Sequence, residues 1–420
     1  MHIQIEKPRL SVPACLLVDD PAPCINPFYY FRLQVDREGH ERHEPCIPLD
    51  FLEQFVGICR ARGIRGKFSV LPYPAGLGSI LDGWEGCHRA ELAAWLELAR
   101  AEIAPHFDIT PEILTHTLAL DLRTRALLPQ PEHDWMAGLT RDELREYFGA
   151  ALAILKAAGF MPAGITQPCY FNGSREVYAA AALAAIQDIG GPPITFYFID
   201  GYFEPPPVPP LEAILLDRAR GEAVVNIIAY CNDHFWPTQR VTSKRADQVV
   251  DALISADGSG GRLAELAAAD EWLTFVCHWQ TLYSDGSRQG LVALDEVAAR
   301  LARAHGPRLL WLTPSEIARY RAASETCWVD VQAQGDGWAI EVDAAFDCPD
   351  FTISVPMPLG AVQQVQLIAG QAADRALLAV RPGVMASGLL PSHAWRQDYD
   401  RVSLCFDLRR GRQIVHLRRH

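Results

Sequence analysis

The sequence predicts a protein of two parts, an α/β barrel followed by an all-β sandwich. Seven or eight short apolar runs alternate with alanine-rich helical stretches before residue 324. These runs are continuously apolar, which is typical of parallel strands that are buried on both faces. After about Ser324 the helical periodicity ends, and short alternating segments separated by turn residues begin. We therefore expect a (β/α) barrel over 1–323 and a β-sandwich over 324–420.

An open, doubly wound sheet is the competing arrangement for the first part. Sheets of that kind often bind dinucleotides through a G-x-G-x-x-G motif that follows the first strand. No such motif follows the first apolar run of this chain, and its absence weakens the dinucleotide-binding alternative.

The first half of the expected barrel alternates four strands with four helices. The strands are expected over 14–20, 66–71, 112–120 and 164–168. The helices are expected over 48–62, 88–104, 140–158 and 174–189. In the third helix Thr140 and Glu143 have the spacing of a capping box, and Gly159 fits the helix end.

The second half continues this alternation and then gives way to β segments. Strands are expected over 194–200, 223–231, 273–278 and 308–313, and helices over 243–255 and 293–305. The proline-rich segment 204–210 must be a surface loop, because proline has no backbone N–H to donate. The strands of the sandwich are expected over 328–333, 338–342, 351–355, 362–368, 376–380, 402–408 and 413–417.

Composition narrows the classes of partner. The chain has 51 acidic and 38 basic residues, a net charge of −13 that disfavours nucleic acid and anionic membranes as partners. No apolar stretch reaches the roughly 18 residues of a membrane span. The 11 cysteines are scattered and form no CxxC, so we expect reduced thiols. Because the N-terminus also lacks the pattern of a signal peptide, we expect a cytoplasmic location.

Two adjacent carboxylates, Asp19 and Asp20, directly follow the first apolar run. In a parallel barrel the active-site residues lie at the ends of the strands, so Asp19 and Asp20 are candidate active-site residues. Adjacent like charges raise each other's pKa unless a cation is present. A divalent metal resolves that repulsion if one carboxylate binds the ion and the other takes a proton from bound water.

Three histidines lie on or after other expected strands. His116 is a candidate metal ligand, and His278 is a candidate ligand or general acid. His234 is a weaker candidate of the same kind. Exposed aromatic rings could form a platform for a sugar, and the candidates are Trp236, Trp279 and Tyr170.

At these residues the sequence resembles the polysaccharide deacetylase superfamily, the NodB-homology group of carbohydrate esterases. The first motif of that family, an Asp-Asp pair after an apolar strand, is matched by Leu16-Leu-Val-Asp19-Asp20-Pro21. The resemblance covers roughly residues 11–320 and implies a distorted seven-stranded (β/α) barrel. It implies that Asp19 is the general base and that Asp20 binds a divalent metal, usually zinc. The implied activity is removal of an acetyl or similar acyl group from an amino sugar or oligosaccharide.

The other motifs of the family match in part. Aligning His-Ser/Thr-x-x-His from His116 places Leu120 at the second ligand position. Either Asp121, His234 or His278 completes the site, or the metal is weakly held, or none binds. The third motif is approximated by residues 166–170, without its arginine. The late-strand motif with a catalytic histidine is approximated by Phe275-Val-Cys-His278. The resulting assignment makes Asp19 and His278 catalytic and Asp20, His116 and His234 metal ligands.

Two other functions remain open at this point. A glycoside hydrolase would need two carboxyl groups roughly 5–9.5 Å apart, for which Asp19 with Asp233 or Asp200 are candidates. A barrel that binds glycans without turnover is the third hypothesis, because the second histidine is missing. The expected partner is a carbohydrate in each case, and the oligomeric state is left open.

Overall fold

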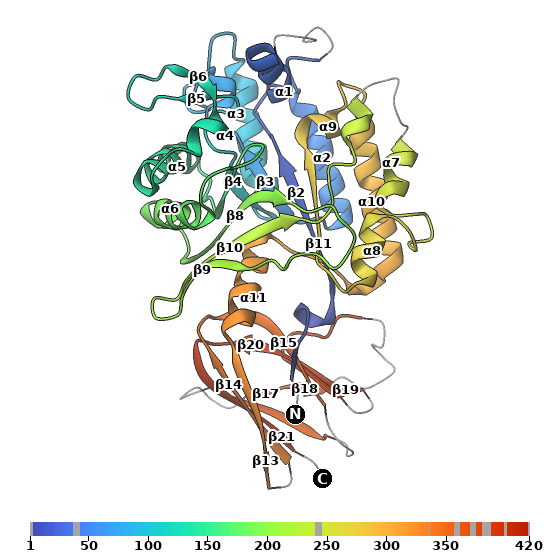
Figure 1. The fold of residues 1–420 in the computed structure, drawn as a ribbon. Coiled ribbons are helices and arrows are strands. Elements are labelled where there is room, and N and C mark those ends of the chain that lie inside the picture. Colours follow the sequence, from blue (N-terminus) through green and yellow to red (C-terminus); the bar gives the residue numbers. More distant parts are fainter. Residues whose placement is uncertain are drawn as a thin grey trace.

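The larger part of the protein is built around two mostly parallel sheets (Figure 1). The computed structural model describes residues 3–36, 43–239, 246–335, 337–356, 362–369, 375–379, 388–398 and 401–418. The first sheet has the order β11 (Leu273–His278), β2 (Val12–Asp19), β3 (Gly66–Val70), β4 (Phe107–Pro111), and β12 (Leu309–Trp311) also pairs with β2. The second has the order β7 (Gly164–Thr166), β8 (Ile194–Gly201), β10 (Glu222–Ala229), β9 (Ala213–Asp217), with β9 antiparallel.

Of the expected barrel, the structure shows two sheets that meet at two isolated bridges. Glu112 bridges to Thr166, and Cys231 bridges to Phe275, both in parallel. Within the described ranges no continuous ladder runs around the whole ring. The parallel sheets and the surrounding helices agree with the expected α/β class.

The strand expected over 112–120 is also wrong in its bounds. Strand β4 ends at Pro111, and positive φ angles at Ile113 (34°) and His116 (65°) take the chain out of extended conformation. A separate antiparallel pair follows, made by β5 (Leu118–Leu120) and β6 (Leu127–Pro131). The chain between β4 and β5 is thus a loop that carries His116.

The helices pack on the outside of the two sheets (Figure 1). The longer ones are α2 (Leu49–Arg62), α3 (Arg89–Leu98), α5 (Arg141–Ala157), α6 (Arg175–Asp188), α10 (Gln289–His305) and α11 (Pro314–Thr326). Shorter ones are α1 (Pro27–Phe31), α4 (Glu132–Met136), α7 (Ala246–Leu253), α8 (Arg262–Ala268) and α9 (Trp279–Tyr283). The capping box of α5 is confirmed, since Thr140 and Glu143 bond reciprocally. Residues 243–245 of one expected helix lie outside the described residues.

The two faces of β3 contact different parts of the protein. One packs against the helix layer, and the other faces the space between the two sheets. Gly66 must lack a side chain, because a Cβ there would lie 1.8 Å from the carbonyl oxygen of Leu16. Phe68 packs among aromatic rings of the helix layer. Lys67 and Ser69 alternate with these residues, are fully buried, and face the opposite way, toward the space between the sheets.

The C-terminal region consists, in its described part, of two five-stranded β-sheets. One has the order β1 (Gln4–Ile5), β15 (Cys348–Pro356), β20 (Arg401–Leu408), β19 (Ala394–Asp398), β18 (Leu378–Ala379). The other has the order β13 (Trp328–Gln334), β14 (Gly337–Ala344), β21 (Gly411–Arg418), β16 (Gln364–Ala369), β17 (Arg375–Ala376). The expected all-β character is confirmed in this region.

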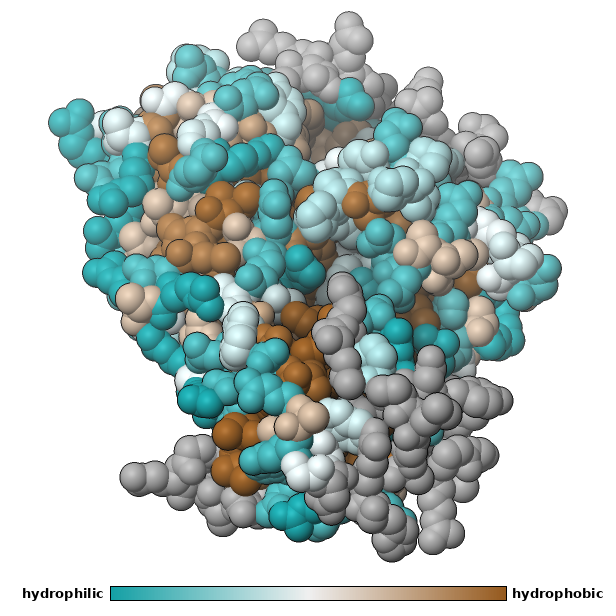
Figure 2. All heavy atoms as spheres, turned by 60° about the horizontal axis from the view of Figure 1, so that its bottom comes forward, coloured by the Kyte–Doolittle hydropathy of each residue, from teal (hydrophilic) through white to brown (hydrophobic). Residues whose placement is uncertain are grey.

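Two elements join the C-terminal sheets to the α/β part. Strand β1, from the start of the chain, pairs with β15, and α11 runs across residue 324. The Tyr320 hydroxyl of α11 donates to the carbonyl oxygen of Glu6 at 2.6 Å and accepts from the Thr352 N–H at 3.2 Å. With the C-terminal end turned forward, apolar residues show near the middle of the molecule beside hydrophilic ones (Figure 2). The division into 1–323 and 324–420 stays a prediction.

No helix in the described ranges is long and apolar enough to cross a membrane. All 11 cysteines are unpaired, and six of them are buried.

Candidate active site

Asp19 and Asp20 lie where β2 ends, next to the end of β11. Asp19 is the last residue of β2 and pairs in register with His278, the last residue of β11. The two aspartates are 6% and 2% exposed, so both carboxyl groups are buried. Asp20 has a φ of 67°, a conformation that is uncommon and costly for a residue other than glycine. The expected gathering of polar groups at one strand edge is therefore present.

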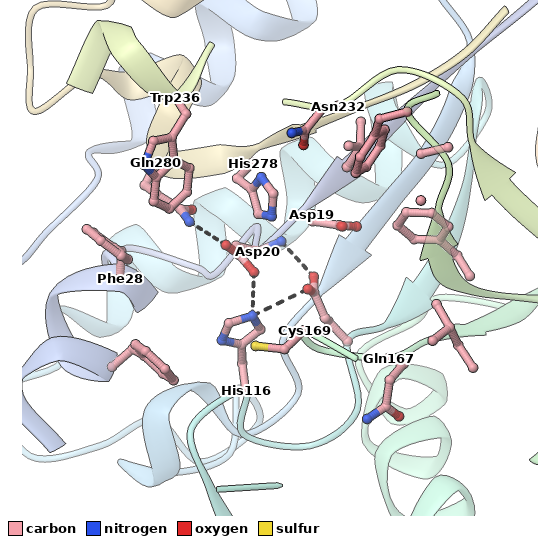
Figure 3. A pocket seen from close by; sticks show the side chains of 18 residues that line it. Asp19, Asp20, Phe28, His116, Gln167, Cys169, Asn232, Trp236, His278 and Gln280 are labelled. Carbon is pink, nitrogen blue, oxygen red and sulfur yellow. Dashed lines mark hydrogen bonds and ion pairs between the residues drawn. The ribbon is translucent and has the colours of Figure 1, made fainter. Parts of the chain in front are cut away.

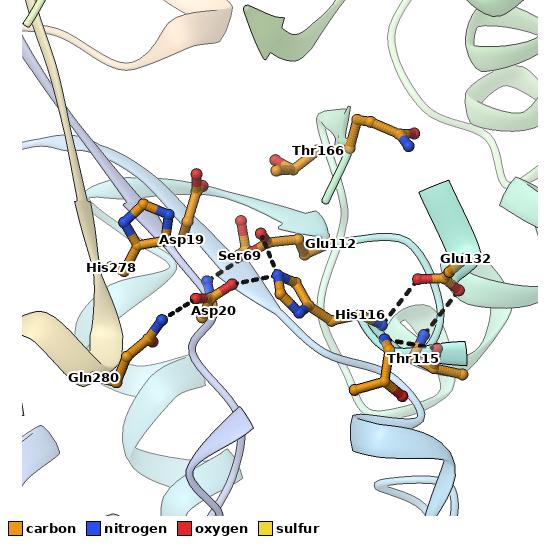
Figure 4. A network of polar contacts seen from close by, with 12 residues as sticks. Asp19, Asp20, Ser69, Glu112, Thr115, His116, Glu132, Thr166, His278 and Gln280 are labelled. Atoms are coloured by element: carbon orange, nitrogen blue, oxygen red, sulfur yellow. Dashed lines mark hydrogen bonds and ion pairs between the residues drawn. The ribbon is translucent and has the colours of Figure 1, made fainter. Parts of the chain in front are cut away.

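Asp20 shares a compact cluster with Glu112 and His116 (Figure 4). One ligand atom from each residue lies within 4.8 Å of the other two. His116 Nε2 lies 2.7 Å from Asp20 Oδ1 and 3.4 Å from Glu112 Oε1. The backbone N–H of Asp20 donates to Glu112 Oε2 at 2.6 Å. Carboxylate and imidazole groups are common ligands of divalent metals, so the donor set has suitable chemistry.

The charges at this cluster are buried and close together. Asp20 Oδ1 is buried, and His116 Nε2 lies 2.7 Å from it as its ion-pair partner. Burial raises the pKa of Glu112 to about 7, and the nearby Asp19 and Asp20 carboxylates add to the rise. Burial alone would also raise the pKa of Asp20, but the facing His116 imidazole outweighs it and lowers the pKa. A divalent ion would relieve the repulsion among the carboxylates.

Glu132 holds the loop that carries His116 (Figure 4). Its Oε1 accepts the backbone N–H groups of Leu114 and Thr115 at 3.1 and 3.0 Å, and its Oε2 accepts that of His116 at 2.8 Å. The Tyr147 hydroxyl donates to the same carboxylate at 2.7 Å. Glu132 is fully buried, and burial raises its pKa. These bonds stabilise the positive φ of His116 and so fix the direction of its ring.

Lys67 is the buried counterion of Asp19. Its Nζ contacts Asp19 Oδ1 and donates to Ser69 Oγ at 2.7 Å and Thr166 Oγ1 at 3.0 Å. Thr110 Oγ1 lies 2.8 Å from Thr166 Oγ1, so a polar row crosses β3, β4 and β7. Burial raises the pKa of Asp19 above its usual value, and the Lys67 ammonium opposes that rise. Asp19 is thus held in place as a carboxyl group of increased basicity.

His278 and Asp233 form a hydrogen-bonded pair on the other side of the aspartates. His278 Nδ1 lies 2.8 Å from Asp233 Oδ2, which also accepts the His278 backbone N–H at 3.2 Å. Burial lowers the pKa of His278, but the bond to Asp233 and the charges of Asp19 and Asp20 outweigh it, and the pKa is about 10. The histidine is therefore positively charged at neutral pH. Its side chain is 30% exposed and faces the pocket (Figure 3).

Asp19, Asp20, Glu112, His116 and His278 line one pocket of about 330 Å³ (Figure 3). Its lining includes five aromatic residues, Phe28, Phe31, Phe198, Phe203 and Trp236. The Phe28 and Trp236 rings meet edge to face at 5.3 Å, and Trp236 lies 5.7 Å from the His278 ring. The amide of Gln280 donates to Asp20 Oδ2. None of the described residues that line the pocket is lysine or arginine.

Four of the expected site residues come together here, and one does not. Asp19, Asp20, His116 and His278 all line the pocket. His234 lies outside both the pocket lining and the cluster around Asp20, so its assignment as a metal ligand finds no support.

Two aromatic candidates for a sugar platform are also corrected. Trp279 is fully buried among Phe51, Phe55 and Phe68, because its ring fills the space between α2 and β3. Tyr170 donates to Asp134 at 3.0 Å and is not among the residues that line the pocket. Trp236 remains, with 43% of its surface exposed.

The alignment of the second motif is corrected as well. Leu120 belongs to β5 and is buried in the core, so it does not occupy a ligand position. Asp121 caps an exposed turn, where it accepts the N–H groups of Arg123 and Thr124. The residue that joins His116 is Glu112, four positions before it instead of four after it. Lys67, Glu112 and Gln280 were missed as site residues, and Glu112 was included in the strand expected over 112–120.

The carboxylates proposed for a glycoside hydrolase have other partners. Asp200 pairs with Arg175 and accepts from Asn226 at 3.2 Å, and it is not among the residues that line the pocket. Asp233 is bonded to His278.

Comparison with known proteins gives only distant likenesses. No protein-family model and no curated protein matches this sequence. Among solved structures, a protein of Mycobacterium smegmatis assigned as a polysaccharide deacetylase matches at 14% identity and a TM-score of 0.44, over 75% of this chain and 92% of its own. The family 30 subfamily 8 xylanase Xyn30A of Clostridium acetobutylicum matches at 10% identity and a TM-score of 0.26, over 99% and 97%. Because both TM-scores lie below 0.5, neither likeness carries an argument about chemistry.

Proposed function

We propose that this chain is a metal-dependent hydrolase that removes an acetyl or similar acyl group from an amino sugar or oligosaccharide. The observation that carries the proposal is the cluster of Asp20, Glu112 and His116 beside a buried carboxyl group and opposite a charged histidine, all around one pocket. We also infer that β2, β3, β4, β7, β8, β10 and β11 are an opened form of a distorted seven-stranded barrel, because the two bridges place them in one circular order.

Asp20, Glu112 and His116 would hold the metal. When bound, a divalent ion would polarise the acyl carbonyl group and lower the pKa of a water molecule. Gln280 fixes the second oxygen of Asp20, and Glu132 fixes the loop of His116, so the donor atoms keep their directions.

Asp19 would take the proton of the attacking water. A general base works best when its pKa approaches the working pH, and burial moves the pKa of Asp19 in that direction. Lys67 keeps the carboxylate charged and fixes its position, since it contacts Oδ1 and is itself held by Ser69 and Thr166.

His278 would give a proton to the departing amine. With a pKa of about 10 it carries that proton at neutral pH. Asp233 occupies Nδ1 and so leaves the opposite ring nitrogen, Nε2, for the substrate. The pair would supply the general acid that the Asp19 base requires.

The lining of the pocket favours an uncharged sugar over an acidic one. Exposed aromatic rings such as Trp236 can pack against the C–H faces of a sugar. Three carboxylates and no lysine or arginine among the described lining residues would repel an acidic substrate.

Product analysis of the metal-loaded protein tests the proposal. The protein is incubated with N-acetylated amino-sugar oligosaccharides, and acetate and new reducing ends are measured in parallel. Release of acetate that is lost in Asp19→Asn supports the proposal, with the exposed Asp82→Asn as a matched control. Reducing ends without acetate would indicate a glycoside hydrolase, and binding without any product would indicate a glycan-binding protein; either result would overturn the proposal.

A further inference from the structure

We propose that Glu112 shifts this metal site away from zinc and toward harder, oxygen-preferring divalent ions such as Mn²⁺. The inference rests on the proposed function, since it concerns the same site. The donor set is two carboxylates and one imidazole, which places two negative charges around the ion. Imidazole suits zinc, whereas carboxylate and water suit manganese and magnesium.

Backbone and side-chain contacts hold Glu112 in place, so its carboxylate stays within the cluster. Glu112 directly follows β4, where a parallel bridge joins it to Thr166 of β7. Its side chain is buried, at 2% exposure. Oε2 accepts the Asp20 N–H at 2.6 Å, while Oε1 lies 3.4 Å from His116 Nε2. One oxygen therefore anchors the side chain, and the other is directed into the cluster (Figure 4).

The net charge of the loaded site follows from these donors. The carboxylates of Asp20 and Glu112 carry two negative charges and His116 is neutral, so they cancel the charge of a bound divalent ion. With a second imidazole at position 112, one positive charge would remain. A compensated ion withdraws less electron density from a bound water than an uncompensated one.

The ratio of zinc to manganese affinity tests the inference. Zinc binds more tightly than manganese at most nitrogen and oxygen sites, so tighter binding of zinc by the wild-type protein would not bear on the inference. The informative quantity is the change in the zinc-to-manganese affinity ratio between wild type and variant. Metal-free protein is titrated with Zn²⁺ alone and Mn²⁺ alone by calorimetry, and free Mn²⁺ is followed by electron paramagnetic resonance. We expect Glu112→His to raise the zinc-to-manganese ratio at least about tenfold over wild type.

Glu112→Gln serves as a second variant that preserves size and the acceptor for the Asp20 N–H. It should raise the same ratio by weakening Mn²⁺ more than Zn²⁺, and thermal unfolding confirms that the variants fold. An unchanged ratio in both folded variants would overturn the inference but leave the proposed function standing. A wild-type protein that binds neither ion would overturn both.

Discussion

The α/β part and the C-terminal β region differ in what they bury. Among the described residues, the buried acidic and basic side chains all precede residue 324, and they are Asp19, Asp20, Lys67, Glu112, Glu132, His133, Asp233 and Arg262. The C-terminal sheets bury only uncharged polar side chains, such as Thr352, Ser354, Ser403 and Gln413. Burying a charge is costly unless it is paired, and strongly shifted groups concentrate at functional sites. The comparison therefore places chemistry in the α/β part and packing in the β region.

Lys67→Met should have the largest effect, because it leaves Asp19 buried without its counterion. We expect the free energy of unfolding to fall by about 3–5 kcal/mol, as measured by denaturant titration. Replacing both partners, in Lys67→Met with Asp19→Leu, should recover much of that stability while abolishing activity. The matched change in the β region is Gln413→Met, which removes a buried but uncharged group. If Lys67→Met lowers the free energy of unfolding no more than Gln413→Met does, the buried charges do not distinguish the α/β part from the β region.

Asp233→Asn should lower the pKa of His278 from about 10 toward its ordinary value, because the hydrogen bond to a carboxylate is lost. With a pKa near the ordinary 6.5, only about a quarter of the His278 rings keep their proton at pH 7, so the rate of acyl release should fall about fourfold there and roughly 10²-fold at pH 9. His278 has a raised pKa in the folded protein, so its stabilising effect is complete below about pH 6.5 and is lost as the pH rises through about 10.

Nuclear magnetic resonance titration of the histidine ring measures that shift directly. His88 is exposed, so His88→Ala serves as the control. It removes one unrelated histidine resonance and should leave the pH dependence of acyl release unchanged. An unaltered pKa of His278 in Asp233→Asn would contradict the assigned pair.

Glu132→Gln should loosen the loop that carries His116. The new amide group faces backbone N–H donors, so we expect a loss of about 1–3 kcal/mol in unfolding free energy. Metal affinity should weaken about 10–100-fold, as is typical when a group that orients a ligand is removed. Thr352→Val in the β region should cost some stability and leave metal affinity unchanged. Equal metal affinity in Glu132→Gln and wild type would show that Glu132 has only a structural role.

Ile353→Val should have the smallest effect. It removes one methylene from the core of the β region and should cost about 0.5–1.5 kcal/mol. Metal binding and the rate of acyl release should stay within twofold of wild type. A larger fall in rate would mean that the β region contributes to catalysis, and it would weaken the division of roles between the two regions.

Strand ends were the informative part of the sequence. Asp19 and His278 could be expected to meet because parallel strands that end together bring their last residues to one edge. Glu112 could not be recognised, because the apolar run 112–120 resembled one strand that contained it. The turn that separates Glu112 from His116 depends on bonds to Glu132, which is distant in sequence from the strand pattern.

Closure of the sheet was beyond the sequence for a related reason. Apolar runs indicate which segments are buried strands, but the isolated bridges that join the two sheets, Glu112 to Thr166 and Cys231 to Phe275, depend on long-range pairing. Strands β6 and β9 were missed: β6 contains two prolines, and β9, although apolar over residues 213–216, is a partly exposed strand. Lys67 was visible near the start of its strand, but its pairing with Asp19 follows only from the β2–β3 arrangement.

A crystal structure of the protein soaked with Mn²⁺, with anomalous scattering to locate the ion, tests the central claim most directly. The account predicts one Mn²⁺ bound to carboxylate oxygens of Asp20 and Glu112 and to Nε2 of His116, with Asp19 beside it and free of the metal. A folded protein that shows no ion at this cluster at saturating Mn²⁺ or Zn²⁺, with His116 still against Asp20, would contradict it.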